Sequence, residues 1–340
     1  MKTGALAFFI KKGGSKVEDI ILELLRQEGD FLSGEEIGKR LHVSRSAVWK
    51  GIRKLREEGY EIQAVTNKGY CLVEQEARYN GKDLTAALKT EKMGRPLYFY
   101  EETDSTNACI RRLAQEGAPE GTLAVADVQT AGRGRRGRAW TSPKGSGIWM
   151  SLLLRPNIPP AKASLITLLS GLSVCKAIER VTGLRPQIKW PNDILLNGKK
   201  IVGILTEMEC EMSDIYFVVP GIGINVNTES FPEELQQKAT SLRLELGHEV
   251  SRNDLLCACM EEIESHYAKF EAAGSFLPLL EDYRKRCITL GATVRVLDRE
   301  PFTADVLDLT DDGELLVRRA DNGKEQVVFS GEVSIRGLQV

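Results

Sequence analysis

The segment of residues 129–140 combines positive charge with a flexible backbone, which suits it to binding phosphate. Its arginines are Arg133, Arg135, Arg136 and Arg138, and its glycines are Gly132, Gly134 and Gly137. One guanidinium group can bind two phosphate oxygens through two parallel hydrogen bonds, and such contacts gain strength where water is excluded. We therefore expect this loop to close over a charged, phosphate-containing intermediate, while Trp140 stacks on a purine base.

The glycine spacing of this loop also matches the dinucleotide-binding fingerprint. That fingerprint must open a helix, whereas Pro143, Gly145 and Gly147 follow here. A P-loop is excluded because no Gly-Lys-Ser/Thr follows the glycines. An exposed arginine-glycine tether for nucleic acid is a further alternative, but the loop lies between two predicted core strands.

Two lysines lie on a predicted β-hairpin and call for anionic partners. Lys189 precedes the Trp-Pro-Asn-Asp motif of residues 190–193 at the end of an apolar strand, and Lys200 lies on the return strand. A purely structural alternative makes Asn192 and Asp193 turn formers and Lys200 a charged edge-strand residue. That alternative explains any one of these residues more readily than the whole set.

The sequence has no group of residues typical of a covalent nucleophile. Its three histidines, His42, His248 and His266, lie outside every motif, and none of its seven cysteines lies beside a histidine. The cysteines are scattered and form no Cys-x-x-Cys pair, which disfavours a zinc site and favours a reduced, cytoplasmic protein.

Alternating strand and helix patterns must position these residues. Strands are predicted at residues 97–101, 122–128, 147–154, 187–196, 200–208 and 215–227, and helices at 105–116, 161–182, 251–273 and 276–287. The Asn197-Gly198 pair predicts a tight hairpin. Gly221 and Gly223 end an apolar strand and would allow close approach of a ligand. Short strands from residue 291 to the end predict a small β-barrel.

The N-terminal part has the pattern of a helix-turn-helix. A helix is predicted over residues 16–28, and Ser33 and Ser44 are candidate N-caps for two more that end near Leu41 and Gly59. Residues 60–65 and 70–73 then predict a hairpin that would be the wing of a winged helix. A linker is expected at residues 74–82.

Positive charge is concentrated in this unit between Lys39 and Arg56, a stretch with seven basic residues and no acidic one. The third helix would direct polar and cationic side chains to the major groove of DNA. The predicted DNA-binding residues are Arg45, Ser46, Lys50, Arg53 and, on the wing, Lys68. Trp49 on the same helix is expected to be half-buried. The alternative is a basic helix in a protein-interaction module.

The whole chain has 340 residues, with 46 Lys and Arg against 48 Asp and Glu, so no global basic excess attracts nucleic acid. The length favours two or three domains. The apolar run at residues 5–10 is shorter than a signal-peptide core, and no span is expected to reach the length of a membrane helix.

Taken in order, these motifs resemble those of biotin protein ligases. The resemblance is carried by Ser105-Thr106-Asn107 and by residues 129–140, 189–193, 200–205, 221–225 and 331–336. The N-terminal winged helix makes the chain similar to the bifunctional form, the biotin operon repressor. The resemblance implies an α+β multidomain fold: a winged helix-turn-helix (16–75), a central α/β ligase domain with a mixed sheet (83–287) and a small SH3-like β-barrel (288–340). Residues 1–15 are expected to be an extension that is foreign to this pattern.

The resemblance also implies roles for individual residues. Biotin or its adenylate would be held by Ser105, Thr106, Asn107, Gln129, Arg133, Gly134, Arg135, Trp140, Lys200, Gly203, Gly221 and Asn225, with Ser105 also capping a helix. The nucleotide side would be completed by Arg136, Arg138, Asn192 and Arg336. Lys189, Arg135 and Lys200 would be catalytic, and Asp193 would help to hold Mg²⁺.

The implied reaction uses ATP and Mg²⁺ to convert biotin into biotinyl-5′-AMP, which then biotinylates a lysine of the biotin carboxyl carrier protein. Operator DNA is the second partner, and biotinyl-AMP would promote a homodimer through an edge strand; no membrane is involved. Two rivals stay open: a biotin-sensing repressor with a decayed ligase site, and a lipoate-type ligase that uses the same adenylation chemistry.

Overall fold

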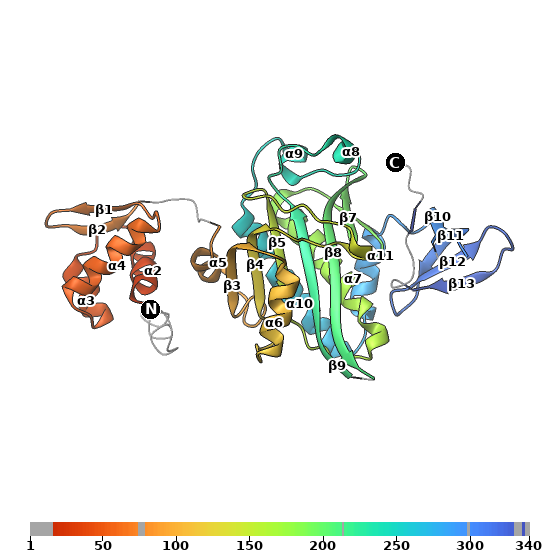
Figure 1. The fold of residues 1–340 in the computed structure, drawn as a ribbon, viewed down its shortest axis with the longest axis horizontal. Helices are drawn as coiled ribbons and strands as arrows, with labels where there is room; N and C mark the ends of the chain where they lie inside the picture. Colours follow the sequence, from red (N-terminus) through yellow and green to blue (C-terminus); the bar gives the residue numbers. More distant parts are fainter. Residues whose placement is uncertain (1–15, 74–78, 213, 298–299, 330–334, 337–340) are drawn as a thin grey trace. The chain divides into compact units, whose positions relative to one another are not determined.

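The computed structural model describes residues 16–73, 79–212, 214–297, 300–329 and 335–336 (Figure 1). The chain divides into two compact units, Met1–Arg78 and Tyr79–Val340, which are described separately. The expected extension over residues 1–15 lies outside the described residues, as do residues 74–78 of the expected linker.

The first unit packs three helices against a hairpin, in the predicted order. Its elements are α2 (Val17–Glu28), α3 (Gly34–Leu41), α4 (Arg45–Glu57), β1 (Ile62–Val65) and β2 (Gly69–Leu72). Both predicted caps are present: Ser33 Oγ accepts the Glu36 amide at 3.1 Å, and Ser44 Oγ accepts the Ala47 amide at 3.2 Å. These bonds satisfy amides that the first helical turn leaves open.

A single apolar core holds this unit together. Ile21, Ile37, Ile52 and Leu55 are fully or almost fully buried in it. The hairpin is tied to the helices because Tyr70 exchanges two backbone hydrogen bonds with Leu32, at 2.8 and 2.9 Å. The hairpin therefore belongs to the same folded body as the helix-turn-helix.

The second unit is built on a mixed sheet of seven strands in the order β3-β4-β5-β9-β8-β7-β6. The strands are β3 (Leu97–Thr103), β4 (Leu123–Gln129), β5 (Gly147–Leu152), β6 (Gln187–Lys189), β7 (Asp193–Leu196), β8 (Lys199–Glu211) and β9 (Asp214–Asn225). Only β3 and β4 pair in parallel among these strands. This confirms the mixed sheet expected for the central domain.

One strand prediction is wrong in detail. The run 187–196 is two strands, β6 and β7, separated by residues 190–192, where the proline interrupts the ladder. Lys189 on β6 and Lys200 on β8 therefore flank β7 and do not face each other across one hairpin. The Asn197-Gly198 turn joins β7 to β8 as predicted, with both residues at positive φ.

Helices cover both faces of this sheet (Figure 1). The longer helices are α6 (Thr106–Gln115), α7 (Ser164–Thr182), α10 (Arg252–Ala273) and α11 (Leu277–Arg286), with shorter ones at α5 (Gly81–Ala87), η1 (Arg135–Gly137), η2 (Pro160–Lys162), α8 (Glu233–Gln236) and α9 (Leu242–Leu246). Leu123 and Val125 pack toward α7 and α10, whereas Ala124 between them packs toward α6. This alternation is what a strand buried on both faces requires.

The expectation that no span reaches membrane length is wrong for α7. With the preceding turn, Pro160–Thr182 has 23 residues, and an 18-residue stretch within it has a mean hydropathy of 1.4, enough by length and composition to cross a bilayer. In the fold, 78% of its apolar window is buried, and it packs against α10 and the sheet. Its hydrophobicity is therefore explained by its place in the core of this unit.

Five antiparallel strands end the chain, in the order β13-β12-β11-β10-β14. They are β10 (Thr293–Val296), β11 (Phe302–Leu309), β12 (Leu315–Arg319), β13 (Glu325–Val328) and β14 (Ile335–Arg336). This sheet is joined to the core of the second unit: Gly313 O accepts the Trp190 indole N–H at 2.9 Å. A Cβ at Gly313 would lie 2.3 Å from Leu168, so the contact requires glycine.

The predicted linker extends too far toward the second unit. Asn80 caps α5, accepting the amides of Lys82 and Asp83 at 2.9 Å, and Tyr79 packs on the core of the second unit. Residues 79–82 therefore belong to the folded part.

Candidate functional site

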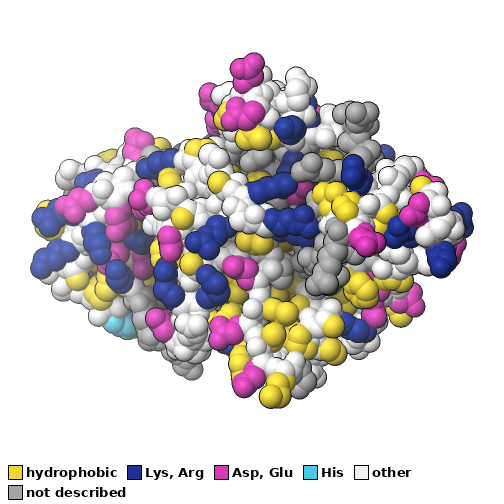
Figure 2. Space-filling view, turned by 45° about the vertical axis from the view of Figure 1, so that its right-hand side comes forward, with side chains coloured by type: hydrophobic (Ala, Val, Ile, Leu, Met, Phe, Trp, Pro, Cys, Tyr) yellow, Lys and Arg dark blue, Asp and Glu magenta, His cyan; other side chains and the backbone are white. Residues whose placement is uncertain are grey.

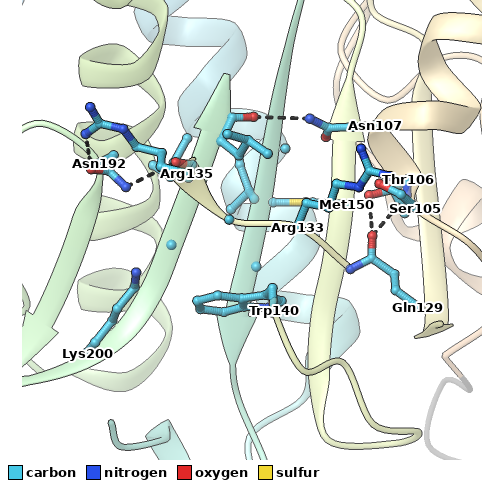
Figure 3. Close-up of a pocket in the computed structure, with 17 residues that line it drawn as sticks. Ser105, Thr106, Asn107, Gln129, Arg133, Arg135, Trp140, Met150, Asn192 and Lys200 are labelled. Atoms are coloured by element: carbon cyan, nitrogen blue, oxygen red, sulfur yellow. Dashed lines mark hydrogen bonds between the residues drawn. The ribbon is translucent and has the colours of Figure 1, made fainter. Parts of the chain in front are cut away.

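One pocket of the second unit gathers most of the predicted ligand residues (Figure 3). Twelve of its lining residues were predicted: Ser105, Thr106, Asn107, Gln129, Arg133, Gly134, Arg135, Trp140, Asn192, Lys200, Gly203 and Gly221. Gly223, which also lines the pocket, had been predicted to allow close approach of a ligand. The other four, Met150, Ile204, Leu205 and Ile222, had no individual role predicted, although all but Met150 lie in the motifs of residues 200–205 and 221–225.

The first turn of α6 is held by a side chain from the neighbouring strand. Gln129 at the end of β4 accepts the Thr106 amide at 3.0 Å and lies 3.1 Å from the Thr106 hydroxyl. Ser105 occupies the N-cap position, but its side chain makes no capping hydrogen bond, so that part of its prediction is wrong. The cap bond comes instead from Gln129, a residue that is distant in sequence.

Asn107 on α6 is almost fully buried and contacts residues of β5, β8 and β9. Its Nδ2 lies 2.7 Å from Glu207 Oε2 and 3.3 Å from Leu205 O, and its Oδ1 lies 2.6 Å from Ser151 Oγ. Ser151 Oγ also lies 2.7 Å from Thr106 Oγ1. Neither Ser151 nor Glu207 was predicted, since a serine and a glutamate within strands carry no motif.

Three glycines on β8 and β9 make room for site side chains rather than for a ligand directly. A Cβ at Gly221 would lie 2.0 Å from Asn107 Oδ1. Cβ atoms at Gly203 and Gly223 would lie 2.8 and 2.5 Å from the Trp140 ring. Because these three positions are glycines, there is room for the side chains of Asn107 and Trp140.

Trp140 closes the base of the arginine loop. Its amide donates to Gly132 O at 2.9 Å, and Arg133 bridges Ala139, so residues 132–140 fold back as a narrow loop. Lys200 Nζ lies 5.2 Å from the Trp140 ring centroid. The indole Nε1 is buried close to Gly223 and has no hydrogen-bond partner among the described residues.

Two cations enter the pocket from opposite sides of a polar cluster. Arg135 donates to Asn192 Oδ1 at 2.7 Å, and Asn192 donates to Asp193 Oδ1 at 3.0 Å. Lys200 Nζ lies 2.6 Å from the same carboxylate oxygen. Burial lowers the pKa of the Arg135 guanidinium, although the Asp193 charge opposes this. A cation that is already desolvated interacts strongly with phosphate.

Several predicted residues lie outside the pocket. Arg136 and Arg138 are exposed near the tip of the loop, and Lys189 is half-buried on β6. Asn225 is buried and donates to Thr240 O at 3.2 Å. Arg336 lies in β14, but its side chain and residues 331–334 of its motif lie outside the described part of the chain.

Within the described residues, no cluster of three or more His, Cys, Asp or Glu side chains could hold a metal ion. Asp193 is the one predicted ligand. Mg²⁺ commonly uses one or two carboxylates and completes its shell with water and substrate phosphates. A lone carboxylate beside the cationic end of the pocket fits that mode of binding.

The predicted DNA-binding side chains are exposed on α4. Arg45 forms an ion pair with Glu35, and Arg53 lies 3.3 Å from Glu57, so part of the basic charge is balanced. Trp49 was expected to be half-buried but is exposed, at 53%, and its ring centroid lies 5.2 Å from the Arg53 guanidinium. Figure 2 shows basic and acidic side chains interspersed over the visible face, as the near-neutral net charge predicts.

Family models match three consecutive parts of the chain. Residues 16–71 match an HTH domain, residues 99–225 the biotin/lipoate A/B protein ligase family, and residues 289–336 the biotin protein ligase C-terminal domain. The matches follow the helix-turn-helix, the mixed sheet and the terminal β-sheet, respectively.

Characterised relatives match along nearly the whole chain. The bifunctional ligase/repressor BirA of Bacillus spizizenii is 41% identical over 319 residues, covering 93% of this chain and 97% of the relative. BirA of Escherichia coli is 30% identical over 317 residues, covering 93% and 96%.

A solved structure matches the second unit. The biotin protein ligase from Aquifex aeolicus in complex with biotin and ATP is similar with a TM-score of 0.62 and 33% identity, covering 71% of this chain and 98% of that one. Because its domains follow the same order and its sequence is 41% identical to BirA, the chain belongs to the biotin protein ligases and, among them, to the bifunctional ligase/repressors.

Proposed function

We propose that this pocket adenylates biotin with ATP and transfers the biotinyl group to a lysine of the biotin carboxyl carrier protein. The observation that carries this proposal is that one cavity contains an amide-rich end at Asn107 and Gln129 and a cationic end at Arg135 and Lys200. The first suits the polar head group of biotin, and the second suits its carboxylate and the α-phosphate.

The first step is attack of the biotin carboxylate on the ATP α-phosphorus, with pyrophosphate as leaving group. Arg135, Lys200 and Lys189 offset charge on the reacting oxygens, and their fixed positions reduce the reorganisation that the step requires. Asp193 would help to hold Mg²⁺, which would neutralise the phosphates. Arg136, Arg138, Asn192 and Arg336 complete the nucleotide side.

Trp140 is assigned to the adenine. Its ring lies against Gly203 and Gly223 and lines the pocket with them, and its indole N–H has no hydrogen-bond partner in the described part of the chain. Asn225 is assigned to the same adenylate site, as a buried residue at the end of β9. In the second step the acceptor lysine attacks the mixed anhydride, and AMP leaves.

The N-terminal unit is assigned to operator DNA as a winged helix-turn-helix over residues 16–75. Helix α4 would enter the major groove with Arg45, Ser46, Lys50 and Arg53. Lys68 in the β1-β2 turn would contact the phosphate backbone of the DNA. The ligase domain is assigned to residues 83–287 together with residues 79–82, which belong to the same compact unit, and a small SH3-like domain is assigned to residues 288–340. A cytoplasmic location follows, since ATP and operator DNA are found there.

Biotinyl-AMP is expected to promote a homodimer, because operators read by winged helices commonly pair two half-sites. The surface that we assign is the edge of β8 beyond Gly203, which no described strand covers on the side away from β9. Exposed strand edges pair with strands of a partner.

The decisive experiment incubates the protein with ATP, Mg²⁺ and either biotin or lipoate, then identifies the acyl-adenylate and the labelled carrier lysine. Biotinyl-AMP and biotinylated carrier protein are expected. Lipoyl-AMP instead would support the lipoate-type rival, and biotin binding without adenylate would support a repressor with a decayed ligase site.

A further inference from the structure

Two residues that do not line the pocket hold the side chains at its amide-rich end. Ser151 on β5 is fully buried, and Glu207 on β8 is half-buried. Both contact Asn107, on opposite sides of its amide: Glu207 Oε2 lies 2.7 Å from Nδ2, and Ser151 Oγ lies 2.6 Å from Oδ1. Their chemistry decides which way that amide points.

An ionised carboxylate can only accept hydrogen bonds. Glu207 forms an ion pair with Arg111 at 3.7 Å. The Asn107 group that faces Glu207 must therefore be the NH₂, and the carbonyl must face Ser151. Ser151 then donates its single hydroxyl proton to Asn107 Oδ1. Both amide protons of Asn107 are used within the protein, by Glu207 and by Leu205 O.

The same reasoning fixes the neighbouring side chains. The Thr106 amide donates to Gln129, so the Gln129 atom at that contact must be its oxygen, and its nitrogen donates to Ser142 Oγ at 2.9 Å. The Thr106 hydroxyl donates to Gln129 Oε1 at 3.1 Å, and its oxygen lies 2.7 Å from Ser151 Oγ. Its proton therefore stays inside the protein.

The side-chain oxygens of Asn107 and Thr106, two residues that line the pocket, are thereby left as hydrogen-bond acceptors, while Ser105 and Arg133 of the same pocket carry donors. Such acceptors favour a head group that donates N–H bonds and penalise one that cannot, because buried acceptors are left unpaired. The cyclic urea of biotin has two N–H groups, whereas the dithiolane of lipoate has none.

We propose that Ser151 and Glu207 are positioning residues that hold the Asn107 amide with its oxygen as an acceptor and thereby favour an acyl substrate with a ureido head group. The inference rests on the proposed function, since it concerns the substrate of that site. It predicts that substrate choice is set partly by two residues that never touch the substrate.

The first test is Ser151→Ala, assayed for adenylate formation with biotin, with biotin methylated on one ureido nitrogen, and with lipoate. The KM for biotin is expected to rise about tenfold while kcat and the KM for ATP change by less than about twofold, the signature of lost ground-state binding. The increase in KM that N-methylation of biotin causes should be smaller in this variant, because the Asn107 oxygen that the methyl group would disturb is no longer held in place. If Ser151→Ala only damaged the fold, less of the protein would be active, and the rates with all three substrates would fall by the same factor.

The second test uses Glu207, whose half-exposed side chain tolerates replacement without a cavity in the core. Glu207→Lys places a donor where the structure has an acceptor and should reverse the Asn107 amide, raising the biotin KM about tenfold. Glu207→Gln keeps an acceptor oxygen and should restore nearly normal binding. Glu209→Lys makes the same charge change two residues along β8, on an exposed side chain outside the pocket, and should behave as the unmodified protein.

Formation of biotinyl-AMP by the unmodified protein tests the proposed function separately. If that activity is present but Ser151→Ala and Glu207→Lys both keep the biotin KM and the N-methyl penalty unchanged, the inference is overturned. If Ser151→Ala does not fold, the comparison of Glu207→Lys with Glu207→Gln decides.

Discussion

Gly221 on β9 and Asn107 on α6 fit together so closely that a Cβ at Gly221 would lie 2.0 Å from Asn107 Oδ1. The glycine is needed for space and not for an unusual backbone angle, since its φ is not in the left-handed region. The position of the Asn107 amide therefore depends on an absent side chain on a strand far away in the sequence.

Gly221→Ala is accordingly expected to displace Asn107 and to raise the KM for biotin about tenfold or more, with a smaller effect on ATP. Steady-state adenylation kinetics measure this. Gly171→Ala is the matched control, because a Cβ there would meet Ile204 at an ordinary 3.7 Å. In a helix that change should stabilise the fold by up to about 1 kcal/mol. Equal effects of the two variants would contradict the prediction.

Arg135→Gly is expected to leave folding intact while biotinyl-AMP escapes before transfer. The guanidinium enters the pocket and donates to Asn192, so its loss removes a phosphate contact and not a core contact. The half-life of the retained adenylate, followed by rapid filtration, should fall about tenfold or more. Arg136→Gly, at an exposed neighbour with positive φ, should have a smaller effect. Unchanged retention in Arg135→Gly would count against the assignment.

Removal of residues 1–75 should leave biotinylation of the carrier protein measurable and abolish specific DNA binding. The two activities are assigned to different compact units, with α4 in the first and the pocket in the second. In the full chain, Arg53→Ala should weaken operator binding without changing the adenylation rate. Operator binding by the truncated protein at full strength would show that the DNA site lies elsewhere.

Stability should fall in mild acid because of His266. This side chain is buried against Ser173, and burial, with the neighbouring Lys176, Lys269 and Arg286, lowers its pKa to about 4, while Asp282 opposes the shift. The folded protein thus holds His266 neutral, whereas the unfolded chain binds a proton near pH 6.5. The contribution of His266 to the free energy of unfolding is complete above pH 6.5. It is lost as the pH falls toward 4, and the loss is at most roughly 3 kcal/mol.

Urea unfolding of the unmodified protein and of His266→Gln between pH 7 and pH 4 measures this contribution. The difference between the two proteins should shrink as the pH falls, since only the histidine takes up a proton on unfolding. A constant difference across that range would mean that His266 is not the titrating group.

Biotinyl-AMP should raise both the dimerisation constant and the operator affinity. Ordering of the arginine loop by the adenylate would remove part of the entropy cost of assembly. Sedimentation with and without biotinyl-AMP, followed by DNA titration at fixed salt, tests the coupling. Met208→Lys places a charge on the exposed edge segment of β8 and should weaken the dimer while adenylation persists. Indifference of both constants to the adenylate would disprove the regulatory proposal but not the ligase proposal.

Local sequence patterns were sufficient for the order of elements and for most of the pocket. Ser33 and Ser44 cap their helices as predicted because a cap involves residues only three apart. The Asn197-Gly198 turn is likewise a local matter. The motifs that contain Thr106, Gln129 and Arg135 converge on one cavity because each lies at the end of a core element or in the loop beside it.

Tertiary structure alone decided which partners those residues have. The helix at Thr106 is capped by Gln129 instead of Ser105, Lys189 and Lys200 are separated by β7, and Arg136 and Arg138 lie outside the pocket. The contacts of Asn107 with Ser151, Glu207 and Gly221 join α6 to three different strands. Such contacts depend on strand register and on which face each side chain takes, and a one-residue shift in register reverses every face.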